Sequence, residues 1–266
     1  MGPVLEVRGG LVRRLRAAGC VFAEEEADLL LAQASSAGGL EALVRRREGG
    51  EPLELVLGWA AFAGLRVGTA AGVFVPRRRS ELLVREGLGA LAGAHAAVVV
   101  DLCCGTGAVG LAVAVAAARA GVAVRLHAAD VDPLATACAA QNLRDVPGAQ
   151  VHTGDLFAAL PGALRGRVDL LLVNAPYVPT GRVALMPPEA RDHEPLTALD
   201  GGADGLDVHR RVAAGAGTWL APGGALVLET SEPQAAGTLA ACRAGGLSAT
   251  AVHDDDLEAS CVLARA

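Results

Sequence analysis

Apolar and polar residues alternate along this chain in two different patterns. From the N-terminus to about Gly50, apolar residues recur at three- and four-residue spacing, which is the pattern of helices with one buried face. This spacing predicts helices over Val4–Ala18, Glu24–Ala34 and Leu40–Arg47. Over Leu53–Val75 the apolar residues are spaced by glycines and include Phe, Trp and Val, so short strands or a hairpin are expected.

The second pattern begins after a helix that is expected over Glu81–Leu91, for which Ser80 is the predicted N-cap. From Ala96 onward, apolar runs of strand length alternate with longer helical patterns, and this alternation specifies a mostly parallel sheet covered by helices on both faces. Only a short acidic tract separates the last two strands, which are therefore expected to pair antiparallel. The predicted strands are Val98–Leu102, Arg125–Asp130, Gln150–Thr153, Val168–Val173, Ala225–Glu229, Ser248–His253 and Ser260–Ala264, and the helices between them are Val109–Ala120, Pro133–Leu143, Asp207–Trp219 and Pro233–Ala244.

These patterns predict an α/β protein in three parts. Residues 1–50 are expected to form a small helical domain, and residues 51–80 a linker with short strands. Residues 81–266 are expected to form a doubly wound domain with a seven-stranded, mostly parallel sheet. A length of 266 residues suits this division, because it allows one domain of about 200 residues and a small companion.

Composition limits the classes of function. The chain is 52% apolar and 20% charged, which is ample for a core. Its net charge of −6 and pI near 5.5 argue against stable binding of nucleic acid. The two arginine runs, Arg45–Arg47 and Arg77–Arg79, are expected to be mainly solvated faces.

No segment predicts export or membrane insertion. The chain starts without a basic and apolar export signal. The uncharged stretch Leu102–Ala118 holds three glycines, and it is shorter than the ~20 apolar residues of a membrane span. With no CxxC pair and no histidine at zinc-ligand spacing, the cysteines are expected to be reduced and buried in a cytoplasmic protein, with no metal. They are Cys20, Cys103, Cys104, Cys138, Cys242 and Cys261.

The rarest residues of the chain stand together. Lysine and isoleucine are absent, and there are only one tyrosine and two asparagines, which indicates a genome that avoids AT-rich codons. Residues with disfavoured codons are expected to persist mainly where chemistry requires them. The tyrosine and one asparagine lie in Asn174-Ala175-Pro176-Tyr177, directly after a predicted strand. An amide, a proline-stiffened backbone and an aromatic ring at a strand end suit the binding of a planar amide or base.

A glycine-rich segment follows the first strand of the sheet and opens a helix. Its glycines Gly105, Gly107 and Gly110 meet the GxGxxG pattern, and Asp130 ends the next strand about twenty residues on. Glycines let the backbone approach a ligand, and the helix N-terminus offers unpaired N–H groups. Sites for dinucleotides and for S-adenosyl-L-methionine share this pattern, so the glycines alone leave both open.

Two carboxylates favour S-adenosylmethionine as the cofactor. Asp101 stands just before the glycines, where it would repel a pyrophosphate but would suit the ammonium group of a methionine moiety. Asp155 and Leu156 follow a later strand, where an acid and an apolar side chain can frame an adenine ring.

Three segments together resemble the protein-(glutamine-N5) methyltransferase family. They are Val75-Pro-Arg77 with Ser80-Glu81, then Asn174–Tyr177, and then Arg191–Leu199. Members of this family methylate the glutamine of the Gly-Gly-Gln tripeptide in peptide-chain release factors. The likeness covers about residues 50–266, whereas the N-terminal helical segment is similar only in kind and shorter.

The resemblance implies a class I methyltransferase fold, methyl transfer from S-adenosylmethionine, and a protein substrate such as a class 1 release factor. The helical domain would then recognise that substrate. The residues implied as cofactor-binding are Asp101, Cys103, Cys104, Gly105, Thr106, Gly107, Asp130, Asp155, Leu156 and Asn174, and those implied as catalytic are Asn174, Ala175, Pro176 and Tyr177.

A carboxamide nitrogen is a poor nucleophile because its lone pair is delocalised. The Asn174 side-chain oxygen and the Ala175 carbonyl can accept both amide hydrogens, which orients the nitrogen and favours the positive charge that develops during attack. Tyr177 would then pack on the amide plane. The remaining task is to place the nitrogen against the methyl group.

Two positions depart from the family pattern. Ala175 stands where the family has a proline; the backbone carbonyl is kept, but some backbone stiffness is lost. Cys103 stands where the family has a glycine, and its larger side chain alters the surface on which the cofactor would lie. Both changes bear more on the substrate than on the reaction. An N-methyltransferase of an adenine or guanine amino group therefore stays an alternative, although the acidic pI counts against it. A methyltransferase of small-molecule amides or amines and a non-enzymatic binding module are the others.

Other residues carry weaker expectations. The loop Pro179–Gly205 is long enough for a lid or a substrate wall, and Glu194 and Pro195 within it are candidates for lining the pocket. His193 and His209 are not assigned as bases, because the amide proton becomes acidic once methylation begins. Asn142 is expected to cap the C-terminus of its helix.

Overall fold

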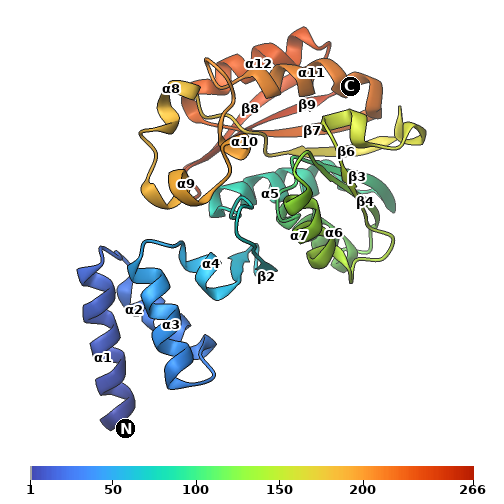
Figure 1. The fold of residues 1–266 in the computed structure, drawn as a ribbon. Helices are drawn as coiled ribbons and strands as arrows, with labels where there is room; N and C mark the ends of the chain where they lie inside the picture. Colours follow the sequence, from blue (N-terminus) through green and yellow to red (C-terminus); the bar gives the residue numbers. More distant parts are fainter. Residues whose placement is uncertain (1) are drawn as a thin grey trace.

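The computed structural model describes the chain from residue 2 to residue 266, with side chains from residue 6 onward. Met1, the first residue of the predicted helical domain, lies outside the described residues. A group of N-terminal helices stands to one side of a large α/β unit, and a short hairpin lies between them (Figure 1).

The N-terminal helices enclose an apolar core of their own. Leu11 and Leu15 stand four residues apart on the first helix and both face this core, together with Leu30 from the second. Ser36 begins the third helix, since its hydroxyl accepts a hydrogen bond from the Gly39 N–H at 3.1 Å. The three helices predicted in this part are present. They are α1 (Gly2–Ala17), α2 (Ala23–Gln33) and α3 (Ala37–Glu48).

The stretch predicted as short strands begins with a helix instead, α4 (Leu53–Leu57). Pro52 stands directly before it, and Gly58 ends it in the left-handed conformation with φ 78°. Leu55 packs with residues near the hairpin, whereas Val56 packs with the N-terminal helices. Because this helix is buried on more than one side, its sequence lacks a polar face and resembles that of a buried strand.

The predicted hairpin follows as β1 (Trp59–Phe62) and β2 (Leu65–Gly68), which pair antiparallel. Its two turn residues, Ala63-Gly64, have φ 48° and 72°, the positive values that a type I′ turn requires. Phe62 and Val67 are buried in the core of the α/β unit, so the hairpin packs on that unit.

Asn142 was expected to cap the C-terminus of its helix, but its side chain bonds other segments instead. Its Oδ1 accepts a hydrogen bond from the Gly68 N–H at 2.9 Å, and its Nδ2 donates to the carbonyls of Gly68 and Thr106, both at 2.9 Å. The side chain thus joins the hairpin to the glycine-rich loop. These partners lie 74 and 36 residues away, which is why the local pattern missed them.

The large sheet has seven strands in the order β5-β4-β3-β6-β7-β9-β8. The first five in this order are parallel, and β9 pairs antiparallel with β8, as predicted, and also with β7. The strand order reverses between β3 and β6, where an open α/β sheet has its binding crevice. The strands are β3 (Ala96–Leu102), β4 (Ala123–Asp130), β5 (Gln150–Thr153), β6 (Val168–Val173), β7 (Leu220–Thr230), β8 (Ser248–Asp254) and β9 (Ala259–Arg265).

Successive strand residues feed two separate cores, one on each face of the sheet. Val99 and Leu170 belong to the core under α5, α6 and α7, whereas Val100 and Leu171 belong to the core under α11 and α12 (Figure 1). The helices are α5 (Glu81–Ala90), α6 (Ala108–Arg119), α7 (Pro133–Leu143), α11 (Asp207–Trp219) and α12 (Ala235–Ala244).

The long connection between β6 and α11 holds three short helices, and backbone pairing of Val178 with Asp200 closes it at its base. In the part of the chain that the structure describes, no helix has the length and apolar character needed to cross a membrane. The short helices are α8 (Thr180–Val183), α9 (Pro188–His193) and α10 (Leu196–Leu199), and the 3₁₀ turns elsewhere are η1 (Arg78–Ser80), η2 (Leu156–Ala159), η3 (Gly162–Leu164) and η4 (Glu232–Gln234).

Candidate active site

A cavity of about 730 Å³ opens at the carboxyl ends of β3, β4 and β6, where the strand order reverses. The glycine-rich loop forms one end, and the residues after β6 form the other. The β6–α11 connection closes over it, with Glu194 and Pro195 in its lining. Of the site residues predicted from the sequence, those that line this cavity are Asp101, Cys103, Cys104, Gly105, Thr106, Asp130, Asp155, Leu156, Asn174, Ala175, Pro176 and Tyr177.

Gly107 is the one predicted site residue that does not line the cavity. It precedes α6 with φ 76°, and a Cβ there would stand 3.1 Å from the Cβ of Ala139 on α7. Its role is therefore to turn the chain and to let two helices approach each other. Cys103, where the family has glycine, also has a positive φ of 55°, so a conformation that favours glycine is held by a larger residue.

Asp101 fastens the glycine-rich loop to the first turn of α6. Its side chain is almost fully buried, and its Oδ2 accepts a hydrogen bond from the Gly110 N–H at 2.8 Å. Burial raises the pKa of this carboxyl to about 7, although the Gly110 bond opposes the shift. A Cβ at Gly110 would approach Asp101 Oδ2 to 2.9 Å, so only glycine allows this contact without a shift.

Asp130 is held in place by backbone groups at the end of β4. Its Oδ2 accepts from the Gly105 N–H at 2.9 Å, and its Oδ1 accepts from the Asp132 N–H at 3.0 Å. Burial raises the pKa of Asp130, and these backbone bonds lower it. Each carboxylate oxygen keeps a second lone pair, so the group fits the paired hydroxyls of a ribose.

Asp155 lies at the rim of the cavity. Its carboxylate pairs with Arg211 of α11 at 2.6 Å, and both side chains are more than half exposed. An exposed pair of this kind contributes little to stability. Arg211 also lines the cavity, and no local pattern indicated it, because it lies in α11, which begins at Asp207, far along the chain from Asp155.

Asn174 and Tyr177 are held by side chains that come from distant parts of the chain. Asn174 Nδ2 donates to the Ser80 hydroxyl at 3.2 Å, and the Tyr177 hydroxyl donates to Glu229 Oε1 at 3.2 Å. Arg79 lies over the Tyr177 ring, 5.9 Å from its centre, and its Nε is 3.4 Å from the same Glu229 oxygen. Ser80 stands at the N-cap position of α5, as expected, but its side chain makes no capping hydrogen bond and accepts from Asn174 instead.

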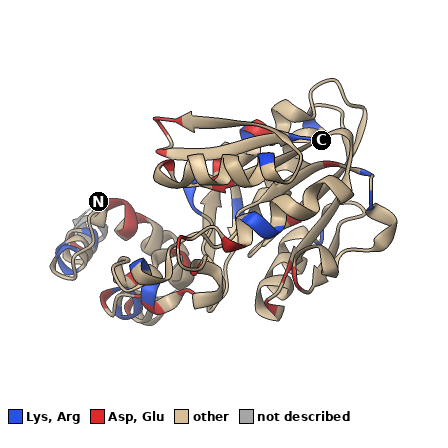
Figure 2. Cartoon of the chain, turned by 90° about the horizontal axis from the view of Figure 1, so that it is seen from above, with Lys and Arg blue, Asp and Glu red and all other residues tan. Residues whose placement is uncertain are grey.

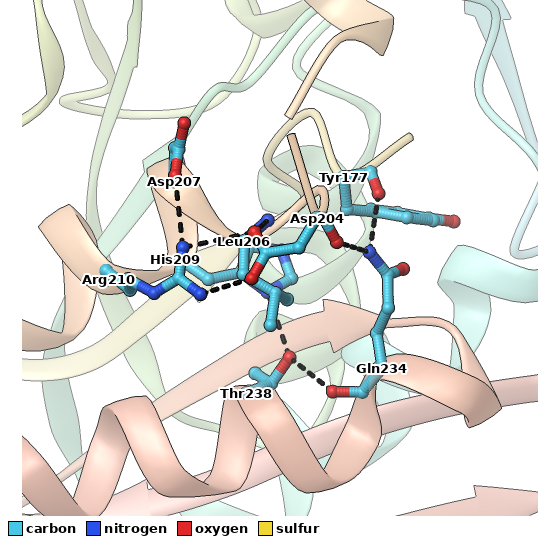
Figure 3. A network of polar contacts seen from close by, with 8 residues as sticks. All are labelled: Tyr177, Asp204, Leu206, Asp207, His209, Arg210, Gln234 and Thr238. Atoms are coloured by element: carbon cyan, nitrogen blue, oxygen red, sulfur yellow. Dashed lines mark hydrogen bonds and ion pairs between the residues drawn. The ribbon is translucent and has the colours of Figure 1, made fainter. Parts of the chain in front are cut away.

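The Tyr177 backbone is fixed by Gln234, a residue that no sequence pattern indicated. Figure 3 shows the Gln234 amide between two carbonyls: its Nε2 donates to Tyr177 O and Asp204 O, both at 2.9 Å. Gly205 has φ 79°, and a Cβ there would lie 2.2 Å from the Tyr177 carbonyl oxygen. The end of the long connection is thereby packed directly on the tyrosine backbone.

His209 lies behind Tyr177 and does not line the cavity. Its Nδ1 hydrogen-bonds the Thr238 hydroxyl at 3.0 Å, and its ring centre is 6.1 Å from that of Tyr177 (Figure 3). Burial lowers the pKa of His209 to about 4, so the imidazole is neutral near pH 7. His209 packs against Tyr177 and Thr238 and was not expected to act as a base.

The connection over the cavity is tied down at two points by ion pairs. Glu194 Oε1 accepts from Arg77 Nη2 at 2.6 Å and from the Val75 N–H at 3.2 Å. Glu189 on α9 pairs with Arg47 of α3 at 2.7 Å. These bonds hold the β6–α11 connection against both the loop before α5 and the N-terminal helices.

The arginine runs are mostly paired within the molecule. Arg47 is buried, contrary to the expectation of a solvated face, and also pairs with Glu26 at 2.7 Å. Figure 2 shows acidic and basic residues interleaved on the N-terminal helices. Among residues 6–266, no group of three His, Cys, Asp or Glu side chains is placed to hold a metal ion.

Known proteins with similar sequences and folds are methyltransferases. The family model of the methyltransferase small domain matches residues 64–186. A 4-amino-L-phenylalanine/4-methylamino-L-phenylalanine methyltransferase of Streptomyces pristinaespiralis is 39% identical over 208 residues, covering 76% of this chain and 69% of that protein. A release factor glutamine methyltransferase of Moorella thermoacetica is 34% identical over 247 residues, covering 85% of this chain and 84% of that protein. A methyltransferase structure from Pyrococcus furiosus shares the fold with a TM-score of 0.55 at 15% identity, covering 76% of this chain and 88% of that one.

Proposed function

Because the chain belongs to the protein-(glutamine-N5) methyltransferase family, we propose that it methylates the side-chain amide nitrogen of a glutamine in a protein. It is a class I methyltransferase that uses S-adenosyl-L-methionine, as its family and fold require. The observation that carries the finer assignment is the presence of Asn174-Ala175-Pro176-Tyr177 and the glycine-rich loop in one cavity.

The cofactor end of this cavity suits S-adenosylmethionine. Asp130 would hold the ribose hydroxyls, because its carboxylate is fixed by Gly105 and keeps lone pairs free. The glycine-rich loop at Gly105 and Thr106 would take the methionine part, and Leu156 would pack on the adenine. The cofactor, when bound, supplies an electrophilic methyl group on sulfur.

The other end of the cavity suits the acceptor amide. Asn174 Oδ1 and the Ala175 carbonyl accept its two hydrogens, and Tyr177 packs on its plane. Held in this way, the amide nitrogen would direct its lone pair at the methyl carbon that the cofactor supplies, with the sulfur as the leaving group. The nitrogen then releases one proton to water, and this release needs no dedicated base.

A class 1 peptide-chain release factor is the proposed protein substrate. The support is the similarity to a release factor glutamine methyltransferase over 85% of the chain. We assign substrate recognition to the helical unit, residues 1–50, since Arg47 joins it to the lid helix at the edge of the cavity.

The test is transfer of labelled methyl from S-adenosylmethionine to the host's purified release factor. The control is the same factor with the glutamine of its Gly-Gly-Gln tripeptide changed to alanine. Label on the first and none on the second is expected. Equal labelling of both, or no label on either while the cofactor still binds, would overturn the proposal.

The amino group of an aromatic amino acid is a second candidate acceptor. The similarity to a methyltransferase of 4-amino-L-phenylalanine, at 39% identity, favours it. Ala175 favours it as well, because it departs from the proline of the family at the acceptor end of the cavity. Offering 4-amino-L-phenylalanine and the release factor separately in the same assay distinguishes the two, since only the true acceptor is labelled at catalytic rates.

A further inference from the structure

The segment Val75–Glu81 resembles the family motif, yet nothing so far explains why a serine stands at position 80. Ser80 is 1% exposed and lies between two polar side chains. On one side Asn174 Nδ2 donates to its Oγ at 3.2 Å. On the other side lies the carboxylate of Glu229, whose pKa the Ser80 hydroxyl lowers and whose Oε2 is buried without a hydrogen-bond partner among residues 6–266.

The direction of these bonds follows from the number of protons available. Glu229 is 2% exposed and faces three donors, which are the Tyr177 hydroxyl, Arg79 and Ser80. Burial raises the pKa of Glu229, but its pair with Arg79 at 3.4 Å favours the ionised carboxylate, which can only accept. The single proton of the Ser80 hydroxyl is therefore directed to Glu229. The Ser80 oxygen then faces Asn174 as an acceptor only, and the NH₂ end of the Asn174 carboxamide must point to it.

The opposite end of the carboxamide is thereby directed into the cavity. Asn174 lines the cavity, and in residues 6–266 its Oδ1 is neither hydrogen-bonded nor among the buried atoms without a partner. Rotation of the carboxamide by half a turn would bring a donor to where an acceptor is needed. At such a position, the N–H groups of a substrate amide would meet N–H groups of the enzyme.

We propose that Ser80 is a positioning residue which, with Glu229 behind it, fixes the direction of the Asn174 carboxamide so that Oδ1 faces the methyl acceptor. The orientation of Asn174 is inferred from the contacts of Ser80 alone, whereas the role of Asn174 Oδ1 in accepting a substrate amide hydrogen rests on the proposed function. The test is chosen so that the two can fail separately.

The chain has only two asparagines, Asn142 and Asn174, so labelling asparagine with ¹⁵N gives two side-chain amide pairs in an NMR spectrum. The pair that disappears in Asn174→Ala belongs to Asn174. In Ser80→Ala we expect that pair to shift, and its protons to exchange with water about five- to tenfold faster, the factor that corresponds to losing one hydrogen bond. The Asn142 pair is an internal control, since Gly68 and Thr106 hold it.

Three further variants make the result specific. Ser80→Thr keeps the hydroxyl and should restore the slow exchange. Ser260→Ala removes another buried hydroxyl, 5% exposed and bonded to His253, and should leave the Asn174 pair unchanged. Glu229→Ala removes the acceptor of the Ser80 proton, so the double variant with Ser80→Ala should exchange no faster than Ser80→Ala alone.

An unchanged Asn174 pair in Ser80→Ala would overturn the proposal. Should that variant unfold, Ser80→Cys keeps the size of the side chain with a weak donor and acceptor, and the same signals decide. In transfer assays, Ser80→Ala should lower kcat about tenfold, the rate equivalent of one such hydrogen bond, with the cofactor Kd unchanged. If the release factor is not the substrate, the unaltered enzyme also fails to methylate it. The Asn174 amide signals still test whether Ser80 positions Asn174.

Discussion

The two ends of the cavity are held together in different ways. At the cofactor end, the key bonds join residues that are close in sequence, such as Gly110 to Asp101 across nine positions and Gly105 to Asp130 across 25. At the acceptor end, Asn174 reaches Ser80 across 94 positions and Tyr177 reaches Glu229 across 52. Strand, loop and helix therefore build the first end locally, whereas the second end exists only once distant segments have packed.

The difference suggests a division of labour. Backbone N–H groups dominate the cofactor end, and they present the same chemistry whatever the neighbouring side chains are. Side chains dominate the acceptor end, so a single substitution can change its specificity. Ala175 lies at this variable end, which agrees with the two acceptor classes among the relatives.

Removing Asn174 should separate the two ends most sharply. Asn174→Ala deletes the acceptor for the substrate amide, and we expect methyl transfer to fall by about 10²–10³-fold, as for other preorganised groups that stabilise developing charge. The Kd for S-adenosylmethionine, measured by calorimetry, should stay nearly the same. Unimpaired transfer by this variant would contradict the proposed role.

Asp101 provides a test of the cofactor end through pH. Its folded-state pKa of about 7 is above the usual 3.8, so the stability it contributes is fully present below pH 3.8 and is lost as pH rises through 7. Asp101→Asn cannot titrate and still accepts from Gly110. The free energy of unfolding of the unaltered protein, measured in urea, should therefore fall relative to this variant by up to about 4 kcal/mol between pH 4 and 8. Parallel curves for the two proteins would show that the carboxyl does not titrate in this range.

Asp130 should affect the cofactor and leave the acceptor end intact. Asp130→Ala removes the acceptor of the Gly105 N–H and the proposed ribose contacts, and we expect the Kd for S-adenosylmethionine to rise about 10–100-fold. Asp145→Ala is the matched control, because this carboxylate does not line the cavity and its exposed pair with Arg144 contributes less than about 1 kcal/mol. Equal losses in both variants would mean that Asp130 has no special place at the ribose.

Cys103→Gly should give the smallest change. Residue 103 has φ 55°, where a residue with a Cβ is strained by about 1–2 kcal/mol, but glycine loses more backbone entropy on folding. The two effects oppose each other, so a net stabilisation below about 1 kcal/mol is expected in thermal unfolding. A clear destabilisation would show that the cysteine side chain packs favourably enough to outweigh its strain.

Regular elements with a clear period were predictable to within a few residues. Pro133–Leu143 and Asp207–Trp219 form helices with the bounds read from the sequence, since each carries its own apolar face. Leu53–Leu57 was predicted wrongly, because a short helix buried on several sides has no polar face to reveal its period.

The local expectations for Ser80 and Asn142 missed their contacts for the same reason. Ser80 and Asn142 both follow local rules for helix caps, yet in the fold each bonds a segment far away along the chain. Gly107 fits the glycine pattern but serves the packing of α6 on α7. Polar side chains satisfy whichever partner the packed structure brings closest, and the local sequence does not specify that partner.

The sequence by itself determined the alternation of strands and helices, the glycine-rich loop, and the grouping of Asn174 with Tyr177, because each depends on residues that are neighbours in the chain. Only the tertiary structure decided which groups orient them. Ser80, Glu229 and Gln234 meet Asn174 and Tyr177 through the packing of the loop before α5, β7 and η4 around the end of β6. Hydrogen bonds act over about 3 Å, so their partners are set by the fold that brings distant residues within that range.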